Sequence, residues 1–162
     1  GNEFYSSYSC IGSTTCNVGI LDTPPILDYI FEFFDNDEKR ELTNYLPQIK
    51  VTGCPNSCAT PQIARLGFSG RRKKDGEYFA IFARGEFSGK TVKLNENLGE
   101  IKANKIPYFL EDIANIIKNE NIEFEKFANE DRFLGLIEDY KEIEVKNVDF
   151  NEFRKIDAEK AW

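Results

Sequence analysis

Histidine and methionine are both missing from this chain of 162 residues, and each absence narrows the possibilities. Without histidine the chain cannot supply a histidine base, a Ser–His–Asp triad or a histidine ligand to a metal. Without methionine the chain begins at Gly1 instead of an initiator residue. We therefore expect it to be a fragment of a longer protein.

Long apolar runs and an excess of basic charge are also lacking. No apolar stretch approaches the roughly 20 residues that a membrane-spanning helix needs, and no signal peptide is recognisable. The formal net charge is −7 at pH 7, which argues against nucleic acid as the main partner. The length and the 41% of hydrophobic residues suit one globular domain with a substantial core. We expect neither a membrane nor a nucleic acid among its partners.

The four cysteines form two close pairs, Cys10 with Cys16 and Cys54 with Cys58. Four thiolates brought together from two loops are typical of a metal or cluster site. The Cys-x5-Cys spacing of the first pair is wider than in four-cysteine zinc sites, whereas a cubane iron–sulfur cluster tolerates wide and unequal spacings. The residues therefore favour an iron–sulfur cluster over zinc, and two disulfides are a further alternative.

The residues around the two cysteine pairs extend this pattern. The first pair stands in CIGSTTCNVGILDT, and the second stands in TGCPNSC, which continues as ATPQIARLGFSG. These segments resemble the paired cysteine signature of the siroheme-dependent nitrite and sulfite reductases, in their C-terminal 4Fe-4S/siroheme domain. The resemblance spans residues 4–120. TGCPNSC is closer to the nitrite reductases and CIGSTTCNVGILDT to the sulfite reductases, so the substrate stays open between the two.

The resemblance implies the metal ligands and two cofactors. Cys10, Cys16, Cys54 and Cys58 would bind a [4Fe-4S] cluster, and the sulfur of Cys58 would also bridge one cluster iron to the iron of siroheme. The resemblance implies that electrons cross this bridge for the six-electron reduction of nitrite or sulfite. In the family, the cationic residues that bind this small anion come from a preceding half of the enzyme. We therefore assign no catalytic residue within this chain.

The same resemblance implies the partners of the chain. They are the missing N-terminal half of the reductase and a ferredoxin-like or other electron donor. We expect an oxidoreductase domain that is inactive alone and cytoplasmic, because four thiols around a cluster suit a reducing compartment. Two alternatives remain, an iron–sulfur electron-transfer module without siroheme and a structural zinc-binding or metal-free domain.

Two further sets of cations are candidates for function. The basic run 71–74 could cradle siroheme carboxylates or dock an acidic ferredoxin, although a solvated hairpin tip explains it as well. Arg84 stands where the family often has glycine, and it could pair with a siroheme carboxylate.

Apolar periodicity and turn residues predict an α+β fold, with a mixed β-sheet of about five strands and helices packed on one face. Residues 1–144 would form the nitrite/sulfite reductase 4Fe-4S domain, and residues 145–162 a C-terminal tail or capping segment. Strands are expected at 3–9, 48–52, 66–70, 77–84 and 90–94, with 66–70 and 77–84 forming a hairpin around the connection 71–76. Helices are expected at 26–34, 58–64, 106–119 and 124–140, and residues 35–45 form a solvated turn or a short helix.

Overall fold

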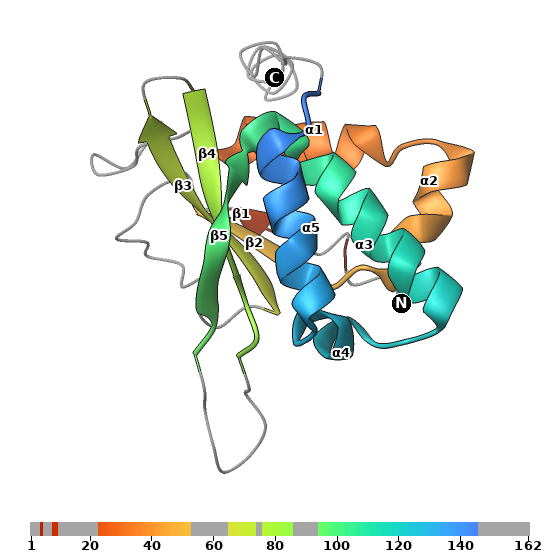
Figure 1. The fold of residues 1–162 in the computed structure, drawn as a ribbon. Helices are drawn as coiled ribbons and strands as arrows, with labels where there is room; N and C mark the ends of the chain where they lie inside the picture. The colour runs from red at the N-terminus through yellow and green to blue at the C-terminus, as the bar shows by residue number, and fades with distance from the viewer. Residues whose placement is uncertain are drawn as a thin grey trace.

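A computed structural model describes residues 4, 8–9, 23–52, 65–73, 76–85 and 94–145, which form a sheet with a layer of helices beside it (Figure 1). The strands are β1 (Tyr8–Ser9), β2 (Ile49–Thr52), β3 (Leu66–Lys73), β4 (Gly76–Ala83) and β5 (Glu96–Lys102). The helices are α1 (Thr23–Phe33), α2 (Asp37–Leu42), α3 (Ile106–Glu120), α4 (Phe124–Ala128) and α5 (Asp131–Glu142), with short 3-10 helices η3 (Thr43–Tyr45) and η5 (Ala103–Lys105).

The direction of the strands defines two ends of the sheet. The spatial order is β1-β2-β3-β4-β5, in which β1, β2 and β3 run parallel while β4 and β5 are each antiparallel to the strand before. The carboxyl ends of β1, β2, β3 and β5 therefore lie together, and we call this the carboxyl end of the sheet. The carboxyl end of β4 lies at the opposite, amino end.

The described helices lie on one side of the sheet, and the core fills the space between the two layers (Figure 1). Val51, Phe68 and Ile81 pair in register across three strands and are fully buried, so they form one row of this core. Ile26 and Ile30, four residues apart on α1, present one helical face to it. Helix α3 adds Ile106, Phe109, Leu110, Ile113, Ala114 and Ile117, and α5 adds Phe133, Ile137 and Tyr140.

These features confirm the α+β fold with a mixed sheet and helices on one face. The helices expected at 26–34 and 106–119 are α1 and α3, and the region 35–45 forms α2 and η3. Asn121 ends α3 with a φ of 52° in the left-handed region, where asparagine is tolerated. Among the described residues, every helix is too short or too polar to cross a membrane. The helix expected at 58–64 lies outside the described residues, and the boundary between 144 and 145 stays a prediction.

The hairpin is longer than the sequence suggested. Strand β3 continues to Lys73, which pairs with Gly76 of β4, so only residues 74–75 connect the two strands. The expected connection 71–76 was therefore wrong in length, and Arg71 and Arg72 lie within a strand. Arginine and lysine do not break a strand, and here the antiparallel ladder extends past the apolar residues that defined the expected one.

The single helix expected at 124–140 is two helices. Asn129 ends α4 with its backbone still in the right-handed helical region, and Glu130 then leaves the helical path with an extended ψ of 154° before α5 begins. The side chain of Arg84 donates hydrogen bonds to the carbonyl oxygens on both sides of this break, 2.6 Å to Ala128 and 3.1 Å to Glu130. A long-range contact therefore stabilises a break that local periodicity does not reveal.

Two expected strands differ from what the structure describes. Of the residues described within 3–9, Tyr8–Ser9 form β1 and Phe4 lies in a 3-10 turn. The last strand runs over Glu96–Lys102, further along the chain than 90–94, most of which lies outside the described residues. Polar residues such as Glu96 and Asn97 hide this strand from an apolar pattern, because it forms an edge of the sheet.

Candidate metal centre

All four cysteines lie outside the described residues, so the candidate site is built here from the elements that lead into it. Cys10 follows β1 directly, and Cys54 follows β2 by two residues. β1 and β2 are parallel neighbours, with Tyr8 opposite Lys50. Both cysteine segments therefore leave the carboxyl end of the sheet from adjacent strands, which lie about 4.8 Å apart.

Covalent geometry limits how far these two cysteines can lie from the strand ends. The Cα atom of Cys10 is one peptide unit, about 3.8 Å, from that of Ser9, and the Cα of Cys54 is two units from that of Thr52. Ser9 is opposite Val51, so β1 and β2 end within one residue of each other in the register. The parallel pairing thus brings the first cysteine of each pair to the same end of the sheet.

The second cysteine of each pair is tethered on both sides by described elements. Cys16 lies in the connection from β1 to Thr23, the first residue of α1. Cys58 lies in the connection 53–65 between β2 and β3, which are parallel neighbours. A parallel pair requires a crossover of a dozen or more residues, and the connection 53–65 is close to that minimum length. The sequence segment TGCPNSC occupies the start of the crossover.

Buried polar side chains lie next to this end, on the sheet face opposite the helices. Lys50 is only 7% exposed, and Thr52 and Ser69 are buried on the same face, since Thr52 pairs with Ser69 in register. The hydroxyl of Thr52 donates to the carbonyl oxygen of Phe68 at 3.5 Å. A lysine buried to this extent is unusual, and its charge favours anionic groups in a low-dielectric setting.

Lys50 was missed from the sequence. The signal that could have found it is a lysine between the apolar residues Ile49 and Val51 of a short strand. Because successive side chains of a strand point to opposite faces, Lys50 lies on the face opposite to that of its core neighbours Ile49 and Val51. Alternation also implies solvent on the polar side of a sheet, and here it fails because the whole of β2 is buried.

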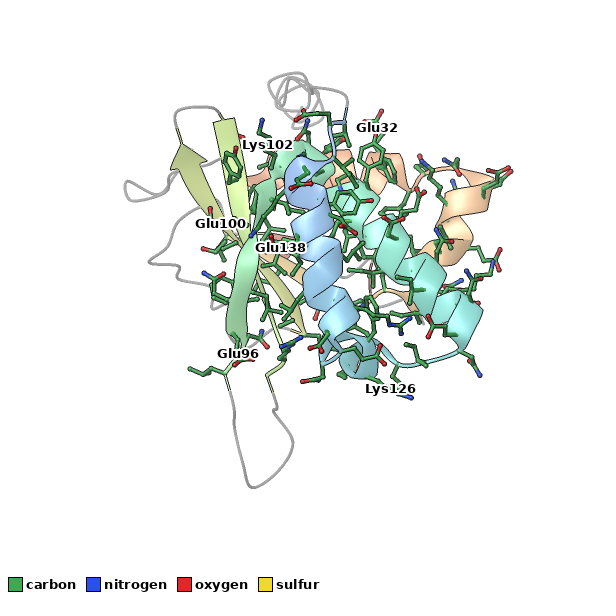
Figure 2. All side chains as sticks on the ribbon, in the orientation of Figure 1. Glu32, Glu96, Glu100, Lys102, Lys126 and Glu138 are labelled. Atoms are coloured by element: carbon green, nitrogen blue, oxygen red, sulfur yellow. The ribbon has the colours of Figure 1, made fainter. Side chains whose placement is uncertain are left out.

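The other cationic candidates divide between the two ends of the sheet. Arg71 pairs with Tyr78 near the carboxyl end, as expected for the hairpin tip. Arg84 follows β4 and lies at the amino end, where its guanidinium binds the carbonyls at the α4–α5 break. In Figure 2, Glu96 and Lys126 lie at the amino end and Lys102 at the carboxyl end. Arg84 therefore supports the helices at the end remote from the cysteine segments.

A groove of about 320 Å³ also lies at the amino end. Pro47 and Arg65, which precede β2 and β3, line it together with Phe124. Arg65 makes an ion pair with Glu125 at 2.5 Å, between two exposed side chains. Among the described residues no three Asp, Glu, His or Cys side chains gather as metal ligands. The described residues, including those that line the groove, therefore offer no alternative metal site to the cysteines.

Comparison with known proteins identifies the family of the chain. Residues 1–142 match the family described as the nitrite and sulphite reductase 4Fe-4S domain. The chain is 29% identical over 136 residues to a sulfite reductase [NADPH] hemoprotein beta-component of Oceanobacillus iheyensis, covering 80% of this chain and 21% of that protein. It is 28% identical over 148 residues to the protein of the same name from Nitrosomonas europaea, covering 88% of this chain and 24% of that protein.

The fold is similar to a solved structure. The Mycobacterium tuberculosis NirA protein matches with a TM-score of 0.56 and 21% identity, covering 78% of this chain and 26% of that one. The chain thus spans about a fifth to a quarter of the length of these relatives. The match over residues 1–142 covers most of the sequence, and the chain belongs to the nitrite and sulphite reductase 4Fe-4S domain family.

Proposed function

We propose that this chain is the cluster- and siroheme-binding domain of a nitrite or sulfite reductase. Cys10, Cys16, Cys54 and Cys58 hold a [4Fe-4S] cluster, and Cys58 also binds the iron of siroheme. The observation that carries the proposal is the parallel pairing of β1 with β2, which sends both cysteine segments out from the same end of the sheet.

The donor set of the chain fits this pair of cofactors. Thiolates are the ligands that iron–sulfur clusters use, and all four cysteines of the sequence belong to the two segments. When bound, the cluster and siroheme supply the electron transfer that reduces a small anion. The protein contributes the thiolate ligands and a buried cation, since Lys50 lies on the strand that leads to Cys54. Its positive charge partly offsets the negative charge of a site with four thiolates.

The rest of a longer reductase supplies what this chain does not. The two relatives named as sulfite reductase hemoprotein components are four to five times longer than the matched region. We propose that the cationic residues for nitrite or sulfite lie in that additional chain, in an N-terminal half, and that a ferredoxin-like or other donor delivers electrons. A reducing compartment such as the cytoplasm suits four cysteines that must stay reduced before a cluster binds.

Anaerobic reconstitution with iron and sulfide tests the proposal. We expect about four irons per chain with cluster absorption, and a changed haem-like band when siroheme is added. Cys58→Ser should lower iron content and abolish the change on adding siroheme, whereas the adjacent Ser57→Ala should leave both near wild type. Cys10→Ser should lower the iron content in the same way.

Each other result selects a different function. A stable cluster with no response to siroheme would favour an iron–sulfur electron carrier. Zinc instead of iron, or no metal at all, would favour a structural domain and would exclude the reductase proposal for this chain. Iron content that is unchanged in all four single Cys→Ser variants would remove the ligand assignment.

A further inference from the structure

The first strand is attached to the sheet by very little pairing. β1 contains two residues, which form two register pairs with β2, and it lies at an edge of the sheet. Strands this short are below the usual range, and an edge strand has a neighbour on one side only. The described pairing of β1 alone therefore gives this strand little attachment to the sheet.

Phe4 provides such a contact. Its side chain is fully buried, and its ring meets Phe31 at 5.6 Å and Phe34 at 5.4 Å between centroids, both in edge-to-face geometry. Phe31 lies near the carboxyl end of α1, and Phe34 is the first residue after that helix. Burial of a phenylalanine and edge-to-face aromatic pairs are both stabilising. Phe4, four residues ahead of Tyr8, is therefore anchored to the helical layer at the end of α1.

The same helix tethers the other side of the first cysteine pair. Residues 10–22 begin where β1 ends, and α1 begins at Thr23. Phe4 packs against Phe31 near the far end of α1. The chain that precedes β1 and the chain that follows residues 10–22 therefore both contact or enter the same helix. A shift of one residue in the β1 register would reverse the face on which each side chain points and would move the start of this segment.

We infer that Phe4 is the positioning residue for the ligand Cys10. This inference rests on the proposed cluster function. Phe4 holds β1, which leads into Cys10, in register with β2, which leads into Cys54. Loosening Phe4 frees Cys10 locally while the rest of the core remains folded.

The test compares two phenylalanine variants of the full chain. Phe4→Leu keeps an apolar side chain but removes the edge-to-face pairs. Phe133→Leu is the matched control, because Phe133 on α5 is also fully buried and also meets aromatic rings edge-to-face, those of Phe109 and Phe127. Two quantities are measured below the melting temperature. They are hydrogen exchange of the peptide covering residues 4–9 in the metal-free chain, and the rate of iron release to a chelator after reconstitution.

Phe4→Leu should accelerate exchange in residues 4–9 and iron release by about 5- to 30-fold, the factor that one to two kcal/mol of lost local stability gives. Phe133→Leu should lower the melting temperature but leave both rates within about two-fold of wild type. If Phe4→Leu does not fold, Phe31→Leu removes one of the same ring contacts and should give the same pattern with a smaller change.

The outcomes separate this inference from the function on which it rests. Equal acceleration in the Phe4 and Phe133 variants would mean that only global stability matters, and would overturn the inference. Faster exchange with iron release at the wild-type rate would overturn it too, because the anchor would then have no effect on the ligand. Failure of the wild-type chain to take up iron would overturn the proposed function itself.

Discussion

The ammonium group of Lys105 donates a hydrogen bond of 2.8 Å to the carbonyl oxygen of Tyr140, thirty-five residues further along the chain. Lys105 is only 2% exposed and ends η5, whereas Tyr140 lies in the last turn of α5. The lysine thus satisfies a carbonyl that the end of a helix leaves without a helical partner. The hydroxyl of Tyr140 completes the junction by donating to the carboxylate of Asp112, and the carbonyl oxygen of Tyr108 lies 3.0 Å from the same hydroxyl.

Lys105→Met should change how the stability of the domain depends on pH. Burial lowers the pKa of Lys105 in the folded protein, with Lys102 adding to this and Glu144 opposing it. The unfolded chain therefore binds more protons at Lys105, so stability gained through this group rises as the pH increases towards 10.5. Wild type should gain stability relative to the variant over that range, measured by urea unfolding at several pH values. A difference that stays constant with pH would contradict the prediction.

Tyr29→Phe should act in the opposite direction at higher pH. Burial raises the pKa of Tyr29 to about 12, with Tyr108 adding to the shift, and its hydroxyl donates to the carbonyl of Asn104 at 3.1 Å. The unfolded chain loses the tyrosine proton first, so this contribution to stability declines between pH 10 and about 12. The variant should lack that part of the alkaline decline in a series of thermal unfolding curves. Parallel curves for the two proteins would argue against a buried protonated Tyr29.

Arg84 should be important for stability through both its side chain and its backbone. Arg84→Ala removes the hydrogen bonds to Ala128 and Glu130 and should lower the free energy of unfolding by about 1–3 kcal/mol. Arg84 has a φ of 74°, a region that favours glycine, so Arg84→Gly should be less destabilising than Arg84→Ala by about 1 kcal/mol. Denaturant unfolding of wild type and the two variants measures the order of their stabilities. An Arg84→Ala variant as stable as wild type would show that the carbonyl groups of Ala128 and Glu130 find other hydrogen-bond donors.

Two glycines offer a matched pair with opposite expectations. Gly99 has a φ of 143°, and a Cβ added there would lie 2.9 Å from Cγ2 of Ile137, so Gly99→Ala should cost about 1–3 kcal/mol. Gly135 lies exposed within α5 with nothing within 4 Å of an added Cβ, so Gly135→Ala should stabilise by about 0.5–1 kcal/mol. Melting temperatures test both. Destabilisation by Gly135→Ala would show that the exposed face of α5 is not free to accept a methyl group.

Elements with a strong local pattern were predictable from the sequence. Helix α3 has an apolar stripe from Ile106 to Ile117 and a proline in its first turn, and its observed limits agree closely with the expected 106–119. β2 was recognisable because Pro47 ends the preceding region and short apolar alternation follows. The cysteine spacing led to the family, since four ligands in two segments form a specific pattern.

Features that depend on distant residues were not predictable. The break between α4 and α5 is stabilised by Arg84, and β5 is defined by pairing with β4 more than by its own polar sequence. The burial of Lys50 depends on what surrounds its strand. For the candidate site, the sequence pointed to the cysteines as candidate ligands, and the parallel pairing of β1 with β2 adds that the strands leading into the two segments are neighbours. The ligand roles of the four cysteines stay a prediction.

The pairing of β1 with β2 also sets an order of events during synthesis. β1 emerges from the ribosome first, but the strand it pairs with begins at Ile49, after α1, α2 and η3 have been made. Translation adds about 5–20 residues per second, so the first cysteine pair waits several seconds before its neighbouring strand exists. Until Cys54 and Cys58 have also been made, the proposed cluster site has only its first pair of cysteines. Under the proposed ligand assignment, a complete cluster can therefore assemble only after the second pair has emerged.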